Sequence, residues 1–478
     1  MTKPLQTILA GLLLSGSPLT AASSDYLIVV STGTVQTPGW EAVVNALEAR
    51  HPARRLAYDG PLAEALLPAL KRWHPRLVCF VARPEEVSRE FVAEVHQLTR
   101  QADDDPYTDC RWGILTGYNA ANALAIAKTD TPLIVRKVAS GTEVALDRCE
   151  QGEWYCELKK NRHVRKEPGG TAGELPGPDD TTAALVKSLN DFQPDLFVTS
   201  GHATERDWQI GFAYRNGSFR HADGRLFGLD TAGDRFPVDS PNPKVYLPIG
   251  NCLMGHIDRP DCMATSWMNS AGVRQMIGYT VTTWYGYAGW GMLDYFVEQP
   301  GRYTFAGAFL ANDHALVHRL QTFFPGLVDA ELPPGGRPRQ PINVTEAARA
   351  EGLSANDGFG LLHDRDVLAF YGDPAWEARM ADGPLNYGQS LKETDGVFTF
   401  EITPLRGRES FAPVNTNGSQ RGGRPFIAFL PHRVQDIRII EGADLKPVVT
   451  DDFVLIPNPA PTDSTAPLRV RFHAAPTP

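Results

Sequence analysis

Short, continuously apolar segments alternate with amphipathic ones over most of the chain, and this alternation constrains the fold more than any other feature. The runs YLIVVST (26–32), RLVCFVA (76–82) and KVYLPIG (244–250) have no polar face, and helical patterns such as that over 62–73 lie between such runs. Strands that are apolar on both sides must be covered on both sides, as in a parallel sheet between two layers of helices. We therefore predict an α/β fold built on mostly parallel sheets.

The character of the sequence divides the chain into four predicted parts. At 478 residues the chain is too long for one ordinary core. We predict a signal peptide over 1–22, an α/β subdomain over 23–139, a second α/β subdomain over 140–382 and a C-terminal domain over 383–478. In the last part helical periodicity vanishes, and short β-type runs separated by turn residues are typical of a β-sandwich.

The first residues have the pattern of a secretory signal. Lys3 precedes an apolar stretch over 8–14, and the small residues Ala21 and Ala22 follow it, which favours cleavage after Ala22 or Ser23. The apolar stretch is too short to cross a bilayer. We expect an exported protein, periplasmic, at the cell surface or extracellular, without a membrane span.

The net charge of the chain indicates which classes of partner it does not bind. The formal net charge is −10, and no basic patch with interleaved aromatic residues is present, which argues against nucleic acid and anionic membranes as partners. The sequence does not indicate an oligomeric state.

Residues 140–180 interrupt the α/β pattern. The segment is polar and rich in glycine and proline, so we predict a long loop there. It contains Cys149 and Cys156, which could form a disulfide across a hairpin in an exported protein.

Two reactive side chains follow predicted strands of the second α/β subdomain. His202 comes after the run 196–199, and Cys252 comes fifty residues later, after the run 244–250. Neighbouring parallel strands release their carboxyl ends at one edge of a sheet, where ligands bind. If these two strands are neighbours, the thiol and the imidazole meet there as a nucleophile and its acid/base partner.

Cys252 has two competing interpretations. A disulfide with Cys262 would remove the thiol from any chemistry. Cys252, His256 and Cys262 could instead ligate zinc, although the spacing offers no fourth ligand.

Several stretches resemble the gingipain-like cysteine peptidases (peptidase family C25), whose fold is related to that of caspases. The resemblance spans roughly 76–380, and the order of the elements is more specific than any one motif. It implies that 140–382 is a caspase-like catalytic subdomain and that the substrate is a polypeptide. The stretches that carry it are SGHATERDW (200–208), VYLPIGNC (245–252), GVRQMIGYTVTTWYG (272–286), FYGDPAW (370–376) and, more weakly, RLVCFVARPEEV (76–87) with DPYTDCRWGILTG (105–117).

Site residues follow from the resemblance. It implies that Cys252 is the nucleophile, that His202 is the general acid/base, and that the backbone amides of Cys252 and Ala203 hold the oxyanion. Trp284 corresponds to the tryptophan that forms a wall of the primary specificity pocket. The sequence departs from the family at Ala203, where the family has glycine, and at Asn251, where it has a small residue.

The resemblance leaves specificity and activity open. In members that cleave after basic residues, an acidic side chain lies at the base of the pocket; here it would come from 140–175, with Asp147, Glu150 and Glu153 as unranked candidates. The chemistry needs no metal or organic cofactor, and a structural Ca²⁺ in the aspartate-rich loops is an additional expectation. The alternative function is an inactive exported binding or assembly protein that keeps the fold, which the departures at Ala203 and Asn251 favour.

Overall fold

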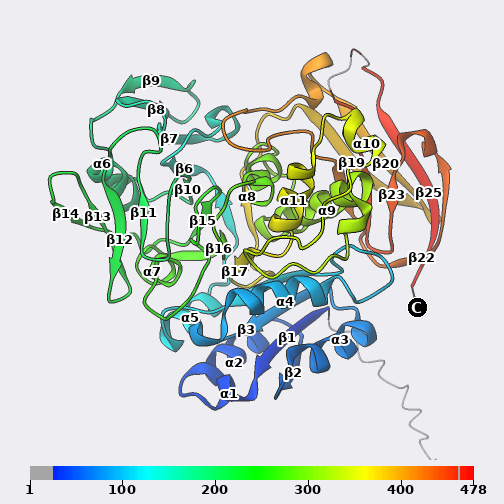
Figure 1. Ribbon diagram of the computed structural model, residues 1–478, viewed down its shortest axis with the longest axis horizontal. Coiled ribbons are helices and arrows are strands. Elements are labelled where there is room, and N and C mark those ends of the chain that lie inside the picture. Colours follow the sequence, from blue (N-terminus) through cyan, green and yellow to red (C-terminus); the bar gives the residue numbers. More distant parts are fainter. Residues whose placement is uncertain (1–24, 461–462, 464, 478) are drawn as a thin grey trace, which may run out of the picture.

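A twelve-stranded sheet runs through the computed structural model, which describes residues 25–460, 463 and 465–477 (Figure 1). Its strand order is β2-β1-β3-β4-β17-β16-β15-β10-β6-β7-β8-β9. Most neighbouring strands are parallel, so the predicted α/β fold with a mostly parallel sheet is confirmed. The predicted signal peptide over 1–22 lies outside the described residues.

The first part of the sheet contains four parallel strands covered on both faces. Helices α2 and α5 contact each other on one face, and α3 and α4 do so on the other. Strands β1 and β3 are buried, and each reads as an apolar run with no polar side, whereas the edge strand β2 has no buried residue. The elements are β1 (Tyr26–Ser31), α1 (Thr32–Gln36), α2 (Trp40–Arg50), β2 (Ala53–Tyr58), α3 (Leu62–Trp73), β3 (Leu77–Val81), η1 (Pro84–Glu86), α4 (Arg89–Thr99), β4 (Arg111–Leu115) and α5 (Ala120–Ala127).

The centre of the sheet belongs to the second α/β part of the chain. Strand β17 is antiparallel to β16 on one side and parallel to β4 on the other, and so joins the two parts into one sheet. The elements are β6 (Lys137–Ser140), α6 (Thr182–Lys187), η3 (Ser188–Phe192), β10 (Leu196–Thr199), β15 (Lys244–Pro248), α7 (Met263–Ser270), β16 (Val273–Tyr279), α8 (Tyr287–Met292), η4 (Leu293–Val297), α9 (Phe305–Phe323), η5 (Pro325–Leu327), α10 (Glu346–Ala350), α11 (Ala355–Asp364) and β17 (Leu368–Tyr371).

The prediction of a long loop over 140–180 is wrong. This segment contains η2 (Leu146–Arg148), β7 (Gln151–Tyr155), β8 (Arg162–Lys166) and β9 (Gly173–Pro176), which extend the sheet at its upper left edge in Figure 1. Every residue of β9 is exposed, so the edge of the sheet carries the polar residues that resemble a loop in sequence.

Two further differences concern strands at the rim. The apolar run over 132–139 contains two strands, because β5 (Leu133–Val135) leaves the main sheet to pair with β18 (Ala378–Met380) and β6 continues in the main sheet. A separate antiparallel sheet also lies between β10 and β15 in the chain. It consists of β11 (Asp207–Gln209), β12 (Ser218–Ala222), β13 (Arg225–Leu229) and β14 (Arg235–Pro237).

The C-terminal part forms two antiparallel sheets that pack on each other, at the right of Figure 1. Phe398 and Phe472 of one sheet share a buried cluster with Phe426 and Ile456 of the other, which is the arrangement of a β-sandwich. The elements are β19 (Tyr387–Thr394), β20 (Val397–Pro404), η6 (Gly407–Phe411), β21 (Phe426–Phe429), β22 (Val434–Glu441), η7 (Ala443–Leu445), β23 (Val448–Val449), β24 (Phe453–Ile456) and β25 (Leu468–Pro476).

Among the described residues, no helix combines the length and the apolar character needed to cross a bilayer.

Candidate active site

The strands that precede His202 and Cys252 are parallel neighbours. Strand β10 pairs with β15 in a register that places Thr199 beside Pro248. His202 follows three residues after Thr199, and Cys252 four residues after Pro248, so both leave the same carboxyl edge of the sheet. The condition for bringing the imidazole and the thiol into one crevice is met.

Both side chains line one cavity of about 420 Å³. Its walls come from the loops that follow β10, β15 and β16, from the segment after β7, and from the C-terminal domain. The lining residues are Glu157, Leu158, Ser200, Gly201, His202, Phe212, Gly250, Cys252, Thr283, Trp284, Gly286, Trp290, Asn417, Gly418 and Ser419.

Cys252 is a half-buried free thiol. Its Sγ accepts a hydrogen bond from the backbone N–H of Thr283 at 3.3 Å and lies 3.6 Å from the carbonyl oxygen of the same residue. The thiol thus accepts from the N–H of Thr283 and donates to the carbonyl oxygen of the same residue, so the loop after β16 fixes the position of the sulfur.

His202 is exposed, and its ring lies against that of Phe212, with ring centroids 4.9 Å apart. Gly201 adopts a positive φ of 95°, a conformation that favours glycine and turns the chain just before the histidine. Among the described residues, no hydrogen bond joins His202 to Cys252 or to a carboxylate.

Asn251 connects the two strand ends. Its Nδ2 donates to the carbonyl oxygen of Gly201 at 3.0 Å, and its Oδ1 accepts from the Thr199 hydroxyl at 2.7 Å. The residue is fully buried. A small residue at 251 could not make these two contacts, so this departure from the family pattern has a structural explanation: the amide fixes the loop before His202 to the loop before Cys252.

Ala203 does not adopt the left-handed backbone conformation that favours glycine. It keeps a negative φ, and it forms an isolated bridge with Trp208. The two backbone hydrogen bonds of this bridge flank the pair, so the N–H of Ala203 points away from β11. Among the described residues, neither this N–H nor that of Cys252 has a hydrogen-bond partner. Cys252 lines the cavity, whereas Ala203 is buried and is not among the lining residues.

Trp284 forms one wall of the cavity and is 41% exposed. Its ring packs against Phe359, with centroids 5.1 Å apart. On its other side lies a second cavity of about 630 Å³, whose lining includes Arg89 and Arg337 and contains no carboxylate. Trp284 therefore separates two neighbouring spaces of different charge.

Glu157 is the only carboxylate among the lining residues of the first cavity, and it is 4% exposed. Its Oε1 accepts from the Thr142 hydroxyl at 2.6 Å and from the Asn417 amide at 3.3 Å. Its Oε2 is buried and has no hydrogen-bond partner among the described residues. Burial raises the pKa of Glu157 above its ordinary value, and the hydrogen bonds from Thr142 and Asn417 oppose part of this rise.

The three acidic candidates proposed from the sequence lie elsewhere. Asp147 is next to Arg148, Glu150 pairs with Arg136, and buried Glu153 contacts His163 and Ser188; none of the three lines the cavity. Sequence reasoning missed Glu157 because nothing in CELKK (156–160) distinguishes it from the other acids of the segment. Its position depends on backbone contacts with a distant loop, where its carbonyl oxygen accepts the N–H of Phe212 at 2.7 Å.

No family model matches the chain, and no curated protein matches it either. Three solved structures are similar to most of it. Gingipain R, described as an Arg-specific cysteine proteinase, is 12% identical, with a TM-score of 0.43 over 93% of this chain and 94% of that chain. A complex of the pro- and mature domains of Porphyromonas gingivalis RgpB is 11% identical (TM-score 0.42; 91% and 93% covered), and a structure described only as a protease is 10% identical (TM-score 0.40; 95% and 97% covered). Identities of this size say nothing about single residues, so the roles of site residues depend on the geometry of this chain.

All six cysteines lie among the described residues and are free thiols. Neither the Cys149–Cys156 nor the Cys252–Cys262 disulfide is formed. The zinc alternative also lacks geometric support, because the described residues do not bring Cys252, His256 and Cys262 together as a group of ligands. Buried Cys262 instead contacts Thr265 at the start of α7, and Cys252 is the one cysteine of the six that is not buried.

Among the residues that the structure describes, one group of carboxylates has the geometry to hold a cation. Ligand oxygens of Asp103, Asp109 and Asp451 all lie within 4.8 Å of one another. Asp109 is buried, and its Oδ2 has no hydrogen-bond partner among the described residues. Arg433 contacts Asp109 and Asp451 and so offsets part of the charge. The donor set, which consists of carboxylate oxygens, fits a hard divalent cation such as Ca²⁺.

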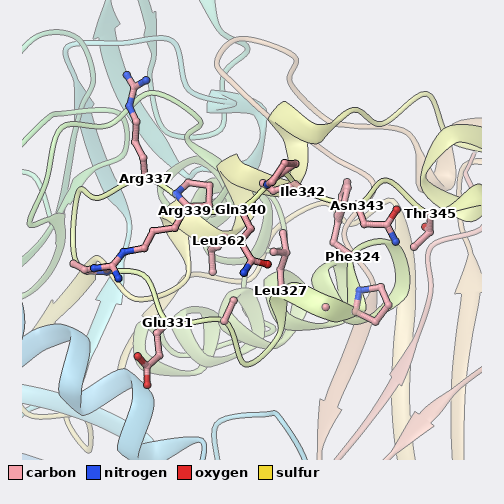
Figure 2. A pocket seen from close by; sticks show the side chains of 16 residues that line it. Phe324, Leu327, Glu331, Arg337, Arg339, Gln340, Ile342, Asn343, Thr345 and Leu362 are labelled. Carbon is pink, nitrogen blue, oxygen red and sulfur yellow. The ribbon is translucent and has the colours of Figure 1, made fainter.

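A larger cavity than that of Cys252, about 530 Å³, lies below the segment 325–343 (Figure 2). Figure 2 shows the Arg337 and Arg339 side chains extending from this segment in different directions, with Leu327, Ile342 and Leu362 in the interior. Its lining contains no cysteine, serine or histidine, and therefore no pair of nucleophile and base. The chemistry-bearing residues belong to the smaller cavity.

Proposed function

We propose that the protein is an exported cysteine peptidase that cleaves polypeptides after a basic residue. The observation that carries this proposal is the convergence of Cys252, His202 and the buried carboxylate of Glu157 on one cavity at the carboxyl edge of β10 and β15. The secretory pattern at the N-terminus supports export, and the motifs around both reactive residues support the peptidase class.

The proposed reaction is acyl transfer through a thioester. The Cys252 thiol gives its proton to His202 as its sulfur attacks the carbonyl carbon of the scissile peptide bond, and the amides of Cys252 and Ala203 stabilise the negative charge on the oxygen. The carbon–nitrogen bond breaks as His202 gives that proton to the leaving amine. Water, deprotonated by His202, then attacks the thioester; the carbon–sulfur bond breaks, the carboxylic acid product leaves, and His202 returns the proton to the sulfur.

The proposed specificity depends on Glu157. A buried carboxylate oxygen without a partner is costly unless a cation or donor meets it. The side chain of an arginine or lysine, inserted along the indole ring of Trp284, would supply that donor. The only other ionisable side chains among the lining residues are those of His202 and Cys252.

The second candidate function is an inactive exported binding or assembly protein. The observation that favours it is the missing hydrogen bond between His202 and the Cys252 thiol among the described residues. Such a protein would still hold a basic side chain in the cavity, but its thiol would not turn over.

A peptidyl probe with an arginine side chain next to a thiol-acylating group tests the proposal. Under reducing conditions we expect the wild type to be labelled at Cys252, because the other five thiols are buried. Cys252→Ala should stay unlabelled, and His202→Ala should label much more slowly, as measured by mass spectrometry of the intact protein. A probe with an aspartate in place of the arginine is the matched control. A wild type that binds the arginine probe without acylation would support the inactive alternative instead.

We also infer that Asp103, Asp109 and Asp451 bind Ca²⁺. Calcium at a hundredfold excess over its Kd should raise the free energy of unfolding by about 2.7 kcal/mol. Asp109→Asn should lose this effect. Asp104→Asn, at an exposed neighbouring aspartate, is the control. Thermal unfolding curves of the wild type that coincide in calcium and in chelator would contradict the inference.

A further inference from the structure

A segment of the C-terminal domain forms one wall of the catalytic cavity. Residues 411–424, here called the strap, run from the end of η6 to just before β21. In Figure 1 the strap is the orange loop that leaves the C-terminal strands and extends to the centre of the molecule. Its residues Asn417, Gly418 and Ser419 line the cavity together with Cys252 and His202. The cavity is therefore incomplete without the C-terminal domain.

Two buried arginines anchor the strap to the catalytic part of the chain. The Nε of Arg421 donates to one carboxylate oxygen of Asp294 at 2.8 Å, and the Nε of Arg424 donates to the other at 2.9 Å. Arg421 also pairs with Glu298. These side chains are at most 6% exposed, and Asp294 and Glu298 belong to η4 and the residue after it. Ion pairs buried to this degree hold the strap in one position.

Close packing over Trp290 fixes the central residue of the strap. Gly418 has a positive φ of 101°, and a Cβ atom at this position would lie 2.2 Å from the Trp290 ring. Only glycine fits both the conformation and the space. The strap therefore approaches the cavity at van der Waals distance, which brings the preceding residue, Asn417, to the carboxylate of Glu157.

Asn417 forms a hydrogen bond with the carboxylate of Glu157, which lines the cavity. Its Nδ2 donates to Glu157 Oε1 at 3.3 Å, and Thr142 and Ser200 also donate to this atom, at 2.6 and 3.4 Å. With three donors on one oxygen, the other oxygen, Oε2, is left buried and without a hydrogen-bond partner among the described residues. The orientation of the carboxylate is thus set partly by a residue from another domain.

We propose that Asn417 is a positioning residue for Glu157, and that the strap makes the C-terminal domain a determinant of substrate specificity. This inference rests on the proposed function, because it assigns Asn417 a role in binding the basic side chain. A donated hydrogen bond stabilises the ionised carboxylate, so Asn417 also keeps Glu157 charged toward lower pH. The chemistry at Cys252 is not affected, because Asn417 touches neither the thiol nor His202 by any hydrogen bond of the described residues.

Steady-state kinetics of Asn417→Ala with an arginine substrate test the inference. Loss of one hydrogen bond to a charged group should raise KM about tenfold, with kcat unchanged. The pH at which KM begins to rise on acidification should move upward, because the pKa of Glu157 rises without its donor. Alkylation of Cys252 by a small uncharged haloacetamide should proceed at the wild-type rate. Asn417→Gln, which keeps a donor, should restore part of the loss.

Thr416→Ala is the matched control, since Thr416 is the exposed neighbour of Asn417 on the strap and does not line the cavity. It should behave as the wild type does. If Asn417→Ala leaves both KM and the pH profile unchanged while the wild type cleaves the substrate, the inference is wrong and the proposed function stands. A haloacetamide rate that falls together with kcat would show a general structural role and would also overturn it. A wild type without any cleavage would instead overturn the proposed function.

Discussion

Replacing Cys252 with alanine should abolish peptide hydrolysis, with kcat reduced at least about 10⁴-fold, which corresponds to about 5.5 kcal/mol of transition-state stabilisation. Alanine has no atom that can form the thioester. KM should change little, because Glu157 and Trp284 still line the cavity. The measurement is the rate of release of a fluorogenic leaving group from an arginine substrate.

Two further variants, His202→Ala and the double variant that also carries Cys252→Ala, test whether the thiol and the imidazole act together. If the thiol and the imidazole act as one unit, His202→Ala alone should cost nearly as much as Cys252→Ala, and the double variant should be no slower than either. Additive losses would contradict a Cys–His pair. Cys262→Ala is the matched control: it removes a buried thiol at the start of α7 that is absent from the cavity, and should leave kcat and KM unchanged.

The position of this pair could be predicted from the sequence because it depends on local patterns. Strands β10 and β15 are buried throughout, and a strand without a polar face can be recognised without knowledge of its neighbours. A histidine and a cysteine after two such strands fall at one edge if the strands are adjacent and parallel, and the register of β10 with β15 confirms that they are. Strand ends in a parallel sheet thus carry information about a site.

Strands at the rim could not be predicted for the opposite reason. Strands β8 and β9 are partly or fully exposed, so their residues are polar and resemble a loop. The link between the two parts of the sheet is also invisible, because β17 joins β4 through Tyr371 and Ile114, more than 250 residues apart. Pairing over such a separation leaves no periodic signal in the sequence.

The departures from the family pattern also needed the structure. The family's glycine could serve a positive φ, but Ala203 has a negative φ. The positive φ occurs two residues earlier, at Gly201. The large side chain at Asn251 proved to be a connection between two loops. In both cases the identity of the residue alone does not show what the departure means, because that depends on the backbone angle of Ala203 and on the hydrogen-bond partners of Asn251.

Under the proposed function, Glu157→Gln should change the substrate specificity more than any other substitution outside Cys252 and His202. Glutamine has the same shape and keeps an oxygen that can accept from Thr142 and Asn417, but it carries no charge. Loss of one partner of a buried charge pair costs about 2–5 kcal/mol. We therefore expect kcat/KM for arginine and lysine substrates to fall on the order of 100-fold, and that for a glutamine substrate to fall much less.

The pH dependence gives an independent measurement of the same group. Burial raises the pKa of Glu157, so its carboxylate takes up a proton at a higher pH than an exposed glutamate does. The protonated form cannot attract a cation; KM for an arginine substrate should therefore rise as pH falls through that raised pKa. In Glu157→Gln this rise should disappear, since nothing at position 157 titrates. An unchanged acidic limb in the variant would assign the titration to another group.

Glu153→Gln is the control that tests whether the effect comes from Glu157 itself or from the general negative charge of its segment. Glu153 is also buried, lies four residues earlier, and was a candidate for the specificity role from sequence alone. It contacts His163 and Ser188 instead of the cavity, so its loss should lower stability without changing the preference for basic residues. Equal effects of the two substitutions on kcat/KM would mean that the preference arises from the general negative charge of this region. A loss of kcat/KM confined to Glu157→Gln would assign the preference for basic residues to the carboxylate of Glu157, whose Oε2 has no hydrogen-bond partner among the described residues.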